Sequence, residues 1–410
     1  MSVSDRSRDV PVDLMRRRNS PFGAVLISLF KRFLPPLDYG RLVVEFPSGE
    51  RAEFCGPQPG PDALLIINNW RFLWRSMTGG EIGFAESYIA NDCTTPDIAT
   101  FLHLIVMNDR SFQVGGGVML SRIVNRWRHF WRRNSRRGSR RNIAAHYDLG
   151  NAFYEKWLDA DMQYSSAIYA TGSESLETAQ KAKLERIVSL LRPEKGDAVL
   201  EIGCGWGGLA EELLRNQCHV TGLTLSSEQL AYARARLNQT GLAERGDLRL
   251  QDYRDVQGTF DRIASVEMVE AVGEKYWPHY FAKLRDSLRP GGIGVIQAIT
   301  IDEDRFDAYR SQPDFIQRYI FPGGMLPTVT ALRAEIAKAG LSLIAVETFA
   351  ESYAKTLQEW RIRFLQAWPS IESLGFDPHF KRMWEYYLAY CEAGFRAQTV
   401  NVGLYQFQRI

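Results

Sequence analysis

A carboxylate followed by closely spaced glycines marks the first candidate site of this 410-residue chain. In the run VLEIGCGWGG, Glu201 is followed by Gly203, Gly205, Gly207 and Gly208. The apolar residues predict a buried strand, and the glycines predict a tight turn into a helix, because glycine permits positive φ and close backbone approach. A nucleotide-like ligand can lie against such a turn. The acid precedes the glycines, which are closer together than in the dinucleotide fingerprint. A turn that is merely tight is the alternative.

Two later loops offer polar side chains to the same ligand. In LTLSSEQ, Thr224 and Gln229 can donate and accept hydrogen bonds but carry no charge. In LQDYRD, Gln251 and Asp252 suit the edge of an adenine, and Tyr253 suits its face. Either loop alone is compatible with ordinary loop chemistry. Three such loops in this order favour S-adenosylmethionine (SAM) as the ligand.

The elements that position these loops alternate between strand and helix. Strands are predicted at 198–203, 219–225, 247–252, 260–269 and 293–301, with helices ending at 216 and spanning 226–238 and 276–288. This alternation predicts a doubly wound α/β sheet with its ligand at the carboxyl ends of the strands. An aromatic-rich insertion at 302–327 follows. The remaining elements are a helix at 328–339, a strand at 341–349, helices at 353–368 and 380–398, and a strand at 402–410.

The length favours two domains. Residues 1–120 are predicted to form a small α+β domain, with two strands within 41–54 and a helix over 97–107. Residues 121–141 form a basic aromatic linker, and residues 142–410 form the catalytic domain. No apolar run approaches the length of a membrane span, and no secretory signal is expected. Five scattered cysteines without metal spacing predict reduced thiols in the cytoplasm and no metal site.

The linker concentrates positive charge in a chain whose net charge is only +2. Residues 122–141 contain nine arginines and no acidic residue. Three interpretations are open: a solvated linker, a surface for anionic lipid headgroups, or a nucleic-acid site. The candidate membrane-surface residues are Arg126, Trp127, Arg128, Trp131, Arg132 and Arg133.

An ordered series of motifs makes the sequence more specific. HYDLGN, MQYSS, EIGCGWGG, TLSSEQ, QDYRD, MVEAVG, YIFPGGMLP, FLQAWP and YYLAYCEAGFR occur in this order within 142–397. The series resembles the cyclopropane-fatty-acyl-phospholipid synthase family, which includes the mycolic acid methyltransferases. GEIGFAESYI resembles the small N-terminal domain of its bacterial members. The resemblance implies the class I SAM-methyltransferase fold, with a seven-stranded sheet and helical insertions.

The resemblance also implies an activity. Such enzymes methylate a cis double bond in a phospholipid acyl chain with SAM and form a carbocation; a base then removes a proton from the added methyl, and a cyclopropane closes. An apolar tunnel for the acyl chain, a homodimer, and a peripheral position on the cytoplasmic face of an anionic membrane are implied as well. This favours the lipid interpretation of the linker over nucleic acid. In MQYSS, Tyr164 and Ser165 are implied to bind SAM.

The family's base is a bound bicarbonate, and its pocket is only partly matched. The resemblance carries candidate catalytic roles to Glu270, Tyr353 and Ile299. Ser166 stands where the family has cysteine, and Gln297 stands where it has histidine. Gln297 can hydrogen-bond but cannot take up a proton, which weakens the expected bicarbonate site.

These departures leave the product open between a cyclopropane and a methylene- or methyl-branched chain, the latter with a partner oxidoreductase. Two other functions also stay open. One is methylation of a soluble small molecule, and the other is a SAM-binding but inactive partner subunit.

Overall fold

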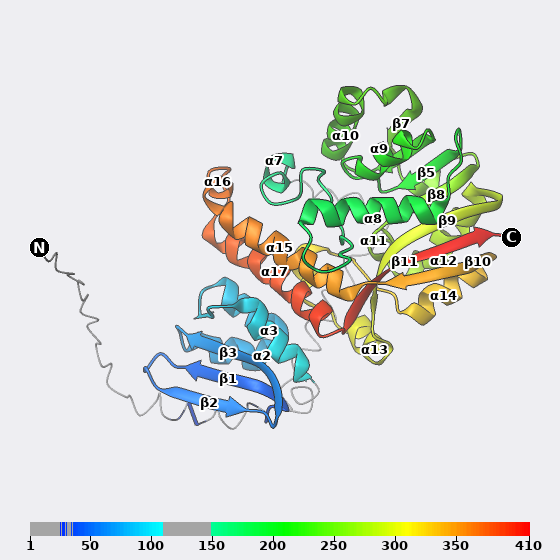
Figure 1. Ribbon diagram of the computed structural model, residues 1–410. Coiled ribbons are helices and arrows are strands. Elements are labelled where there is room, and N and C mark those ends of the chain that lie inside the picture. The colour runs from blue at the N-terminus through cyan, green and yellow to red at the C-terminus, as the bar shows by residue number, and fades with distance from the viewer. Residues whose placement is uncertain (1–24, 26, 29, 31–33, 35, 110–148) are drawn as a thin grey trace, which may run out of the picture.

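The computed structural model describes residues 25, 27, 28, 30, 34, 36–109 and 149–410 and contains two β-sheets (Figure 1). The basic aromatic linker lies outside the described residues. Both predicted domain boundaries, after 120 and after 141, also fall there and stay predictions.

The N-terminal sheet has four strands in the order β2-β1-β3-β4. Its elements are β1 Tyr39–Glu45, β2 Arg51–Cys55, β3 Gln58–Ile67, α2 Arg71–Ile89, β4 Cys93–Thr94 and α3 Ile98–Met107. The strand pair expected within 41–54 and the helix expected over 97–107 are both confirmed. Asp97 caps α3 by accepting hydrogen bonds from the backbone of Ala99 and Thr100, which satisfies amides at the helix start.

The larger sheet has seven strands in the order β10-β11-β9-β8-β5-β6-β7. The strands are β5 Ala198–Ile202, β6 His219–Thr224, β7 Gly246–Leu250, β8 Phe260–Val266, β9 Leu288–Ile301, β10 Leu341–Thr348 and β11 Val400–Arg409. β5 to β9 pair in parallel, and β11 runs antiparallel between β9 and β10. The predicted doubly wound α/β sheet is therefore confirmed.

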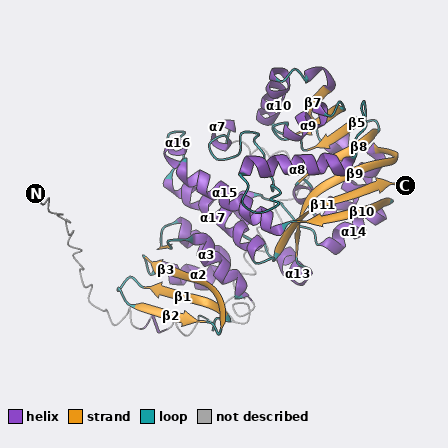
Figure 2. Ribbon diagram, viewed as in Figure 1, coloured by secondary structure: helices purple, strands orange, loops and turns teal. Residues whose placement is uncertain are grey.

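Helices cover both faces of this sheet (Figure 2). One face packs against α8 Leu176–Leu191, α9 Gly208–Arg215 and α10 Ser227–Gln239, and the other packs against α11 Val269–Val272, α12 Trp277–Ser287 and α14 Val329–Lys338. Neighbouring strand residues point to opposite faces, so Val199 joins the first core and Leu200 the second. This two-sided burial explains why neighbouring apolar residues such as Val199 and Leu200 of β5 are both buried.

β9 begins five residues earlier than the sequence predicts. Pro-Gly-Gly at 290–292 suggests a break between a helix and a strand, yet Leu288 already pairs with Phe260 of β8. The ladder shifts register between Phe260 and Arg262. Such an irregularity accommodates a proline, which has no N–H to donate to a neighbouring strand.

A pair of long helices, α15 Ala350–Gln366 and α17 Pro378–Arg396, lies between the two sheets (Figure 1). Arg382 of α17 donates hydrogen bonds to the carbonyls of Tyr88 and Cys93, at 2.6 and 2.8 Å. The remaining elements are α7 Asn151–Tyr154, α13 Glu303–Ser311, a π-helical turn at Ile316–Ile320 and α16 Trp368–Glu372, with 3-10 turns at Ala243–Arg245, Tyr253–Asp255 and Glu274–Tyr276. A shared apolar core joins the N-terminal sheet to these helices.

An aromatic cluster forms before the large sheet. Phe153, Tyr154 and Trp157 have ring centroids 5.1 to 5.8 Å apart. They reach Trp360 on α15 and Trp384 on α17. The cluster fills the space between the helices α15 and α17 and the glycine-rich turn that follows β5.

Two further observations concern the described part of the chain. All five cysteines lie in it, and each is unpaired. Within these same ranges, none of the helices combines the length and the apolar character that crossing a membrane requires.

Gly294→Ala is expected to lower the free energy of unfolding by about 1–3 kcal/mol, because overpacking forces side chains from their preferred positions. A Cβ at Gly294 on β9 would lie 2.3 Å from the ring of Phe407 on β11, which is fully buried. Urea denaturation measures the change. Gly79→Ala is the control, since its Cβ would meet nothing within 4 Å. Equal losses in both variants would contradict the packing argument.

Candidate active site

The glycine turn after β5 has the geometry of a ligand cradle. Gly203, Gly205 and Gly207 all have positive φ, at 86, 51 and 85°. A Cβ at Gly203 would lie 2.8 Å from Cγ of Met268, so the turn and the loop after β8 can approach only because this residue is glycine. A Cβ at Gly205 would meet nothing within 4 Å, which leaves its backbone open to a ligand.

Glu201, on the strand that enters the turn, is a buried carboxylate. Its Oε2 atom has no hydrogen-bond partner among the described residues. Burial raises the pKa of Glu201 to about 8, and the nearby Lys183 opposes the rise. A buried carboxylate with a free acceptor atom favours a ligand that brings a positive charge or a hydrogen-bond donor.

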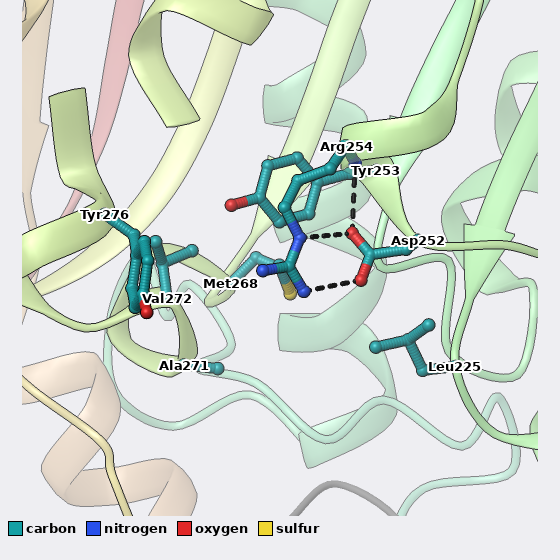
Figure 3. A pocket seen from close by; sticks show the side chains of 8 residues that line it. All are labelled: Leu225, Asp252, Tyr253, Arg254, Met268, Ala271, Val272 and Tyr276. Atoms are coloured by element: carbon teal, nitrogen blue, oxygen red, sulfur yellow. Dashed lines mark hydrogen bonds and ion pairs between the residues drawn. The ribbon is translucent and has the colours of Figure 1, made fainter. Parts of the chain in front are cut away.

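A pocket lies beside the turn, at the carboxyl ends of β6, β7 and β8 (Figure 3). Its lining includes the predicted residues Asp252 and Tyr253, and Arg254 donates to the Asp252 carboxylate through Nε at 2.8 Å and Nη2 at 2.6 Å. The rest of the lining was not singled out from the sequence: Leu225, Met268, Ala271, Val272 and Tyr276. Leu225 belongs to LTLSSEQ and Met268, Ala271 and Val272 belong to MVEAVG, but the sequence analysis assigned none of these positions to the cofactor site.

Three further predicted cofactor residues meet at the ends of β6 and β7. Thr224 and Gln229 are buried, and the Thr224 hydroxyl donates to Oε1 of Gln229 at 2.9 Å. The backbone N–H of Gln251 donates to the Thr224 carbonyl at 3.0 Å. Ser226 caps α10, as expected, by accepting from the Gln229 backbone. The hydroxyl and the amide are therefore oriented by each other and by the helix start.

Tyr164 and Ser165 are held by side chains distant in sequence. The Tyr164 and Tyr387 hydroxyls lie 2.9 Å apart. The buried Lys183 of α8 donates from Nζ to the Ser165 hydroxyl at 2.9 Å and to Oε1 of Gln163 at 2.8 Å. Burial lowers the pKa of Lys183 to about 8. This lysine was not predicted from the sequence, because its position on α8 resembles that of any surface lysine.

The five candidate catalytic residues come together around two carboxylates, one of which sequence analysis missed. Glu267 accepts at Oε1 from the backbone of Ser166 and from Nε2 of Gln297, both at 2.8 Å, and at Oε2 from the Tyr353 hydroxyl at 2.7 Å. Glu270 accepts at Oε1 from the backbone of Ile299 at 2.6 Å, and its Oε2 has no partner among the described residues. The signal available in the sequence was a second carboxylate three residues before Glu270.

The two carboxylates titrate differently. Burial raises the pKa of both carboxyl groups. For Glu270 the negative charge of Glu267 adds to the effect, and its pKa rises to about 8. Three hydrogen-bond donors oppose the rise at Glu267. We therefore assign the negative charge to Glu267 and the first proton to Glu270, since hydrogen bonds to an anion favour the charged form.

Comparison with known proteins identifies the family. The family model described as "Mycolic acid cyclopropane synthetase" matches residues 134–407. The chain belongs to this family. Tuberculostearic acid methyltransferase UfaA1 of Mycobacterium tuberculosis is 40% identical over 331 residues, which are 79% of this chain and 78% of that protein. Cyclopropane-fatty-acyl-phospholipid synthase of Escherichia coli is 40% identical over 265 residues, which are 64% and 66% of the two chains.

Solved structures agree with this assignment. Mycolic acid cyclopropane synthase CmaA1, complexed with SAH and CTAB, aligns with a TM-score of 0.62 at 26% identity and covers 66% of this chain and 98% of its own. Cyclopropane synthase MmaA2 from Mycobacterium tuberculosis gives the same values. The resemblance stated from the motifs is confirmed. This member of the family is a SAM-dependent methyltransferase, and SAM is its methyl donor.

The described residues fit SAM. Glu201 offers an unpartnered buried carboxylate oxygen, and Gly205 leaves the backbone of the turn open. The pocket beside them carries Asp252 and Tyr253, which suit the edge and the face of an adenine.

Glu201→Gln is expected to weaken SAM binding about tenfold near pH 9, because a charge-assisted hydrogen bond is lost. Ionisation of Glu201 favours a cationic ligand, so wild-type affinity rises with pH until the carboxyl is deprotonated, near its pKa of about 8. Toward about pH 6.5 the two proteins should converge, since wild type is then protonated as well. Calorimetric titration with SAM measures both proteins.

Wild type and Glu201→Gln are compared at the same pH, so any titration of SAM itself affects both affinities equally and cancels in their ratio. Glu244→Gln, at an exposed carboxylate of the same domain, is the matched control and should follow wild type. A constant affinity ratio between Glu201→Gln and wild type across this range would contradict the assignment.

Proposed function

We propose that this enzyme methylates a double bond in an unsaturated acyl chain of a membrane phospholipid. The observation that carries the proposal is the partly buried pair Glu267 and Glu270, whose pKa values are raised by burial and which flank Met268 of the pocket. Such a pair suits a reaction that creates positive charge on carbon. The names of the Escherichia coli and Mycobacterium tuberculosis relatives point to fatty acyl substrates.

SAM supplies an electrophilic methyl on a positively charged sulfur. In the proposal, Glu201 and the glycine turn orient its charged part, and Asp252 and Tyr253 hold its adenine. Tyr164 and Ser165 border it from the other side. Held by these residues, SAM would present its methyl to the substrate near the Glu267–Glu270 pair.

The alkene would donate its electron pair to the methyl, the carbon–sulfur bond of SAM would break with its electrons going to the sulfur of the departing SAH, and the neighbouring alkene carbon would become a carbocation. The two carboxylates stabilise that charge, and so do aromatic faces. Tyr353 packs against Phe395 with ring centroids 4.4 Å apart and against Trp360 at 6.2 Å. Tyr353 and Trp360 are buried, which excludes the water that would trap the cation.

A proton must then leave the added methyl, and two products are open. If it leaves at once, the C–H electron pair closes a cyclopropane. If a hydride first moves from the methylated carbon to the cation, the same proton loss gives a methylene branch. Gln297 in place of histidine slows removal of the proton relative to the hydride shift, because an amide cannot take a proton up. This favours the branched product, which a partner oxidoreductase can reduce to a methyl branch.

We also propose where the enzyme works. The acyl chain would lie among the aromatic and aliphatic side chains of α15, α17 and the insertion at 302–327. The arginines and tryptophans of 121–141 would contact anionic headgroups, so that the enzyme acts as a homodimer on the cytoplasmic face of a membrane. The proposed domains are 1–120 and 142–410, on either side of this linker.

Purified enzyme incubated with SAM and vesicles of an unsaturated anionic phospholipid should increase the acyl-chain mass by about 14 units, the net gain of one methylene. Mass spectrometry measures the gain, and fragmentation or NMR distinguishes a ring from a branch. Vesicles of a saturated phospholipid are the control. Turnover of a soluble acceptor without vesicle binding would favour a small-molecule methyltransferase, and SAM binding without any turnover would favour an inactive subunit.

Glu270→Gln is expected to lower kcat at saturating SAM while leaving SAM affinity largely intact, because Glu270 faces the reacting centre. The ionised carboxylate is the form that stabilises the cation. Activity should therefore rise with pH to a midpoint no higher than about 8, since the sulfonium lowers the Glu270 pKa. The loss in the variant should be larger near about pH 9 than near about pH 7. Loss of SAM affinity instead would move Glu270 to the cofactor site.

A further inference from the structure

Glu267 stands at the convergence of four segments that are distant in sequence. Its carboxylate is partly buried and joins the loop carrying Ser166, β9 through Gln297, and α15 through Tyr353. The next residue, Met268, lines the SAM pocket. We propose that Glu267 is the proton acceptor of the reaction and that this enzyme uses its own carboxylate where bicarbonate would otherwise be bound. This inference rests on the proposed function.

The backbone conformation of Glu267 indicates that the glutamate side chain has a function at this position. Its φ is 48°, in the left-handed region that favours glycine and that other residues enter at a conformational cost. Its N–H donates to the Gln297 carbonyl at 2.9 Å, so the strained residue is fixed between β8 and β9. Residues held in such conformations gather at functional sites. A glutamate that only filled space could be a glycine here without strain.

The hydrogen bonds leave one atom of the carboxylate able to accept a proton. A carboxylate oxygen has two lone pairs. Oε1 uses both, for Ser166 and Gln297, whereas Oε2 accepts only from Tyr353. Oε2 is therefore the basic position, and Tyr353 orients it.

Bicarbonate does not fit the same place. The donors that would hold the anion there are the Ser166 backbone, Gln297 Nε2 and the Tyr353 hydroxyl, and Glu267 already engages all three. A second anion would also face the negative charge of Glu267 in a partly buried site. Gln297 brings no positive charge to offset it.

The proton transfer balances without a co-reactant. A C–H bond of the added methyl breaks, and its proton goes to Oε2 of Glu267. Its electron pair forms the third bond of the cyclopropane or, after the hydride shift, the π bond of the methylene. The positive charge on carbon and the negative charge on Glu267 are both neutralised. The proton is released to solvent once the product has left.

Two substitutions at Glu267 both remove the proposed base, but only one of them opens space for bicarbonate. Glu267→Gly removes the carboxylate, relieves the positive φ and opens the site, so a folded protein with at least about 100-fold lower turnover is expected. Added bicarbonate should restore part of this turnover. Glu267→Gln also loses the base but keeps the pocket filled, so bicarbonate should not rescue it. Wild type should be equally active in bicarbonate-depleted and supplemented buffer.

Binding of ¹³C-labelled bicarbonate to the SAH-loaded proteins, followed by NMR, tests the pocket without any lipid. Glu267→Gly should bind the ion, and wild type and Glu267→Gln should not. Bicarbonate binding to wild type, bicarbonate-dependent wild-type turnover, or full turnover of Glu267→Gly in depleted buffer would each overturn the proposal. If wild type methylates no lipid and also binds no bicarbonate, the proposed substrate is wrong. The inference that Glu267 occupies the bicarbonate position would still stand.

Discussion

The active site depends on burying negative charge beside a cationic cofactor. Two carboxylates three residues apart, Glu267 and Glu270, are partly removed from water, and such burial is unfavourable unless hydrogen bonds or positive charge compensate. Glu267 is compensated by three donors, and Glu270 by one. The remaining imbalance favours a ligand with positive charge. A sulfonium, and later a carbocation, supplies that charge where it is most stabilised.

The fold provides the donors by bringing strand ends and helix starts to one edge. β5, β6, β7 and β8 run in parallel, so the loops that follow them meet at the same edge of the sheet. The antiparallel β11 inserts beside β9 and is preceded by α17, which packs against α15. Tyr353 on α15 thereby reaches a carboxylate that follows β8. The N-terminal sheet stabilises the helix pair from its far side through contacts such as those of Arg382.

Much of this could be predicted from local patterns. Alternating apolar strands and helices predicted the sheet, and Ser226 and Asp97 predicted helix starts that the structure confirms. The early start of β9 could not be predicted, because a register shift with β8 admits a Pro-Gly-Gly sequence that by itself indicates a break. Lys183 was missed for a related reason: its burial depends on Gln163 and Ser165, which lie on a separate loop.

The sequence alone determined the family and the cofactor, since both depend on contiguous motifs whose chemistry is local. The glycine turn after Glu201 and the two polar loops that carry Thr224 and Asp252 are each a contiguous stretch, and together they predict a SAM site. Sequence also showed that Ser166 and Gln297 depart from the family's anion pocket. Only the tertiary structure decided what fills that pocket. Glu267 meets Ser166, Gln297 and Tyr353 across 101, 30 and 86 residues of chain, and no local pattern records such convergence.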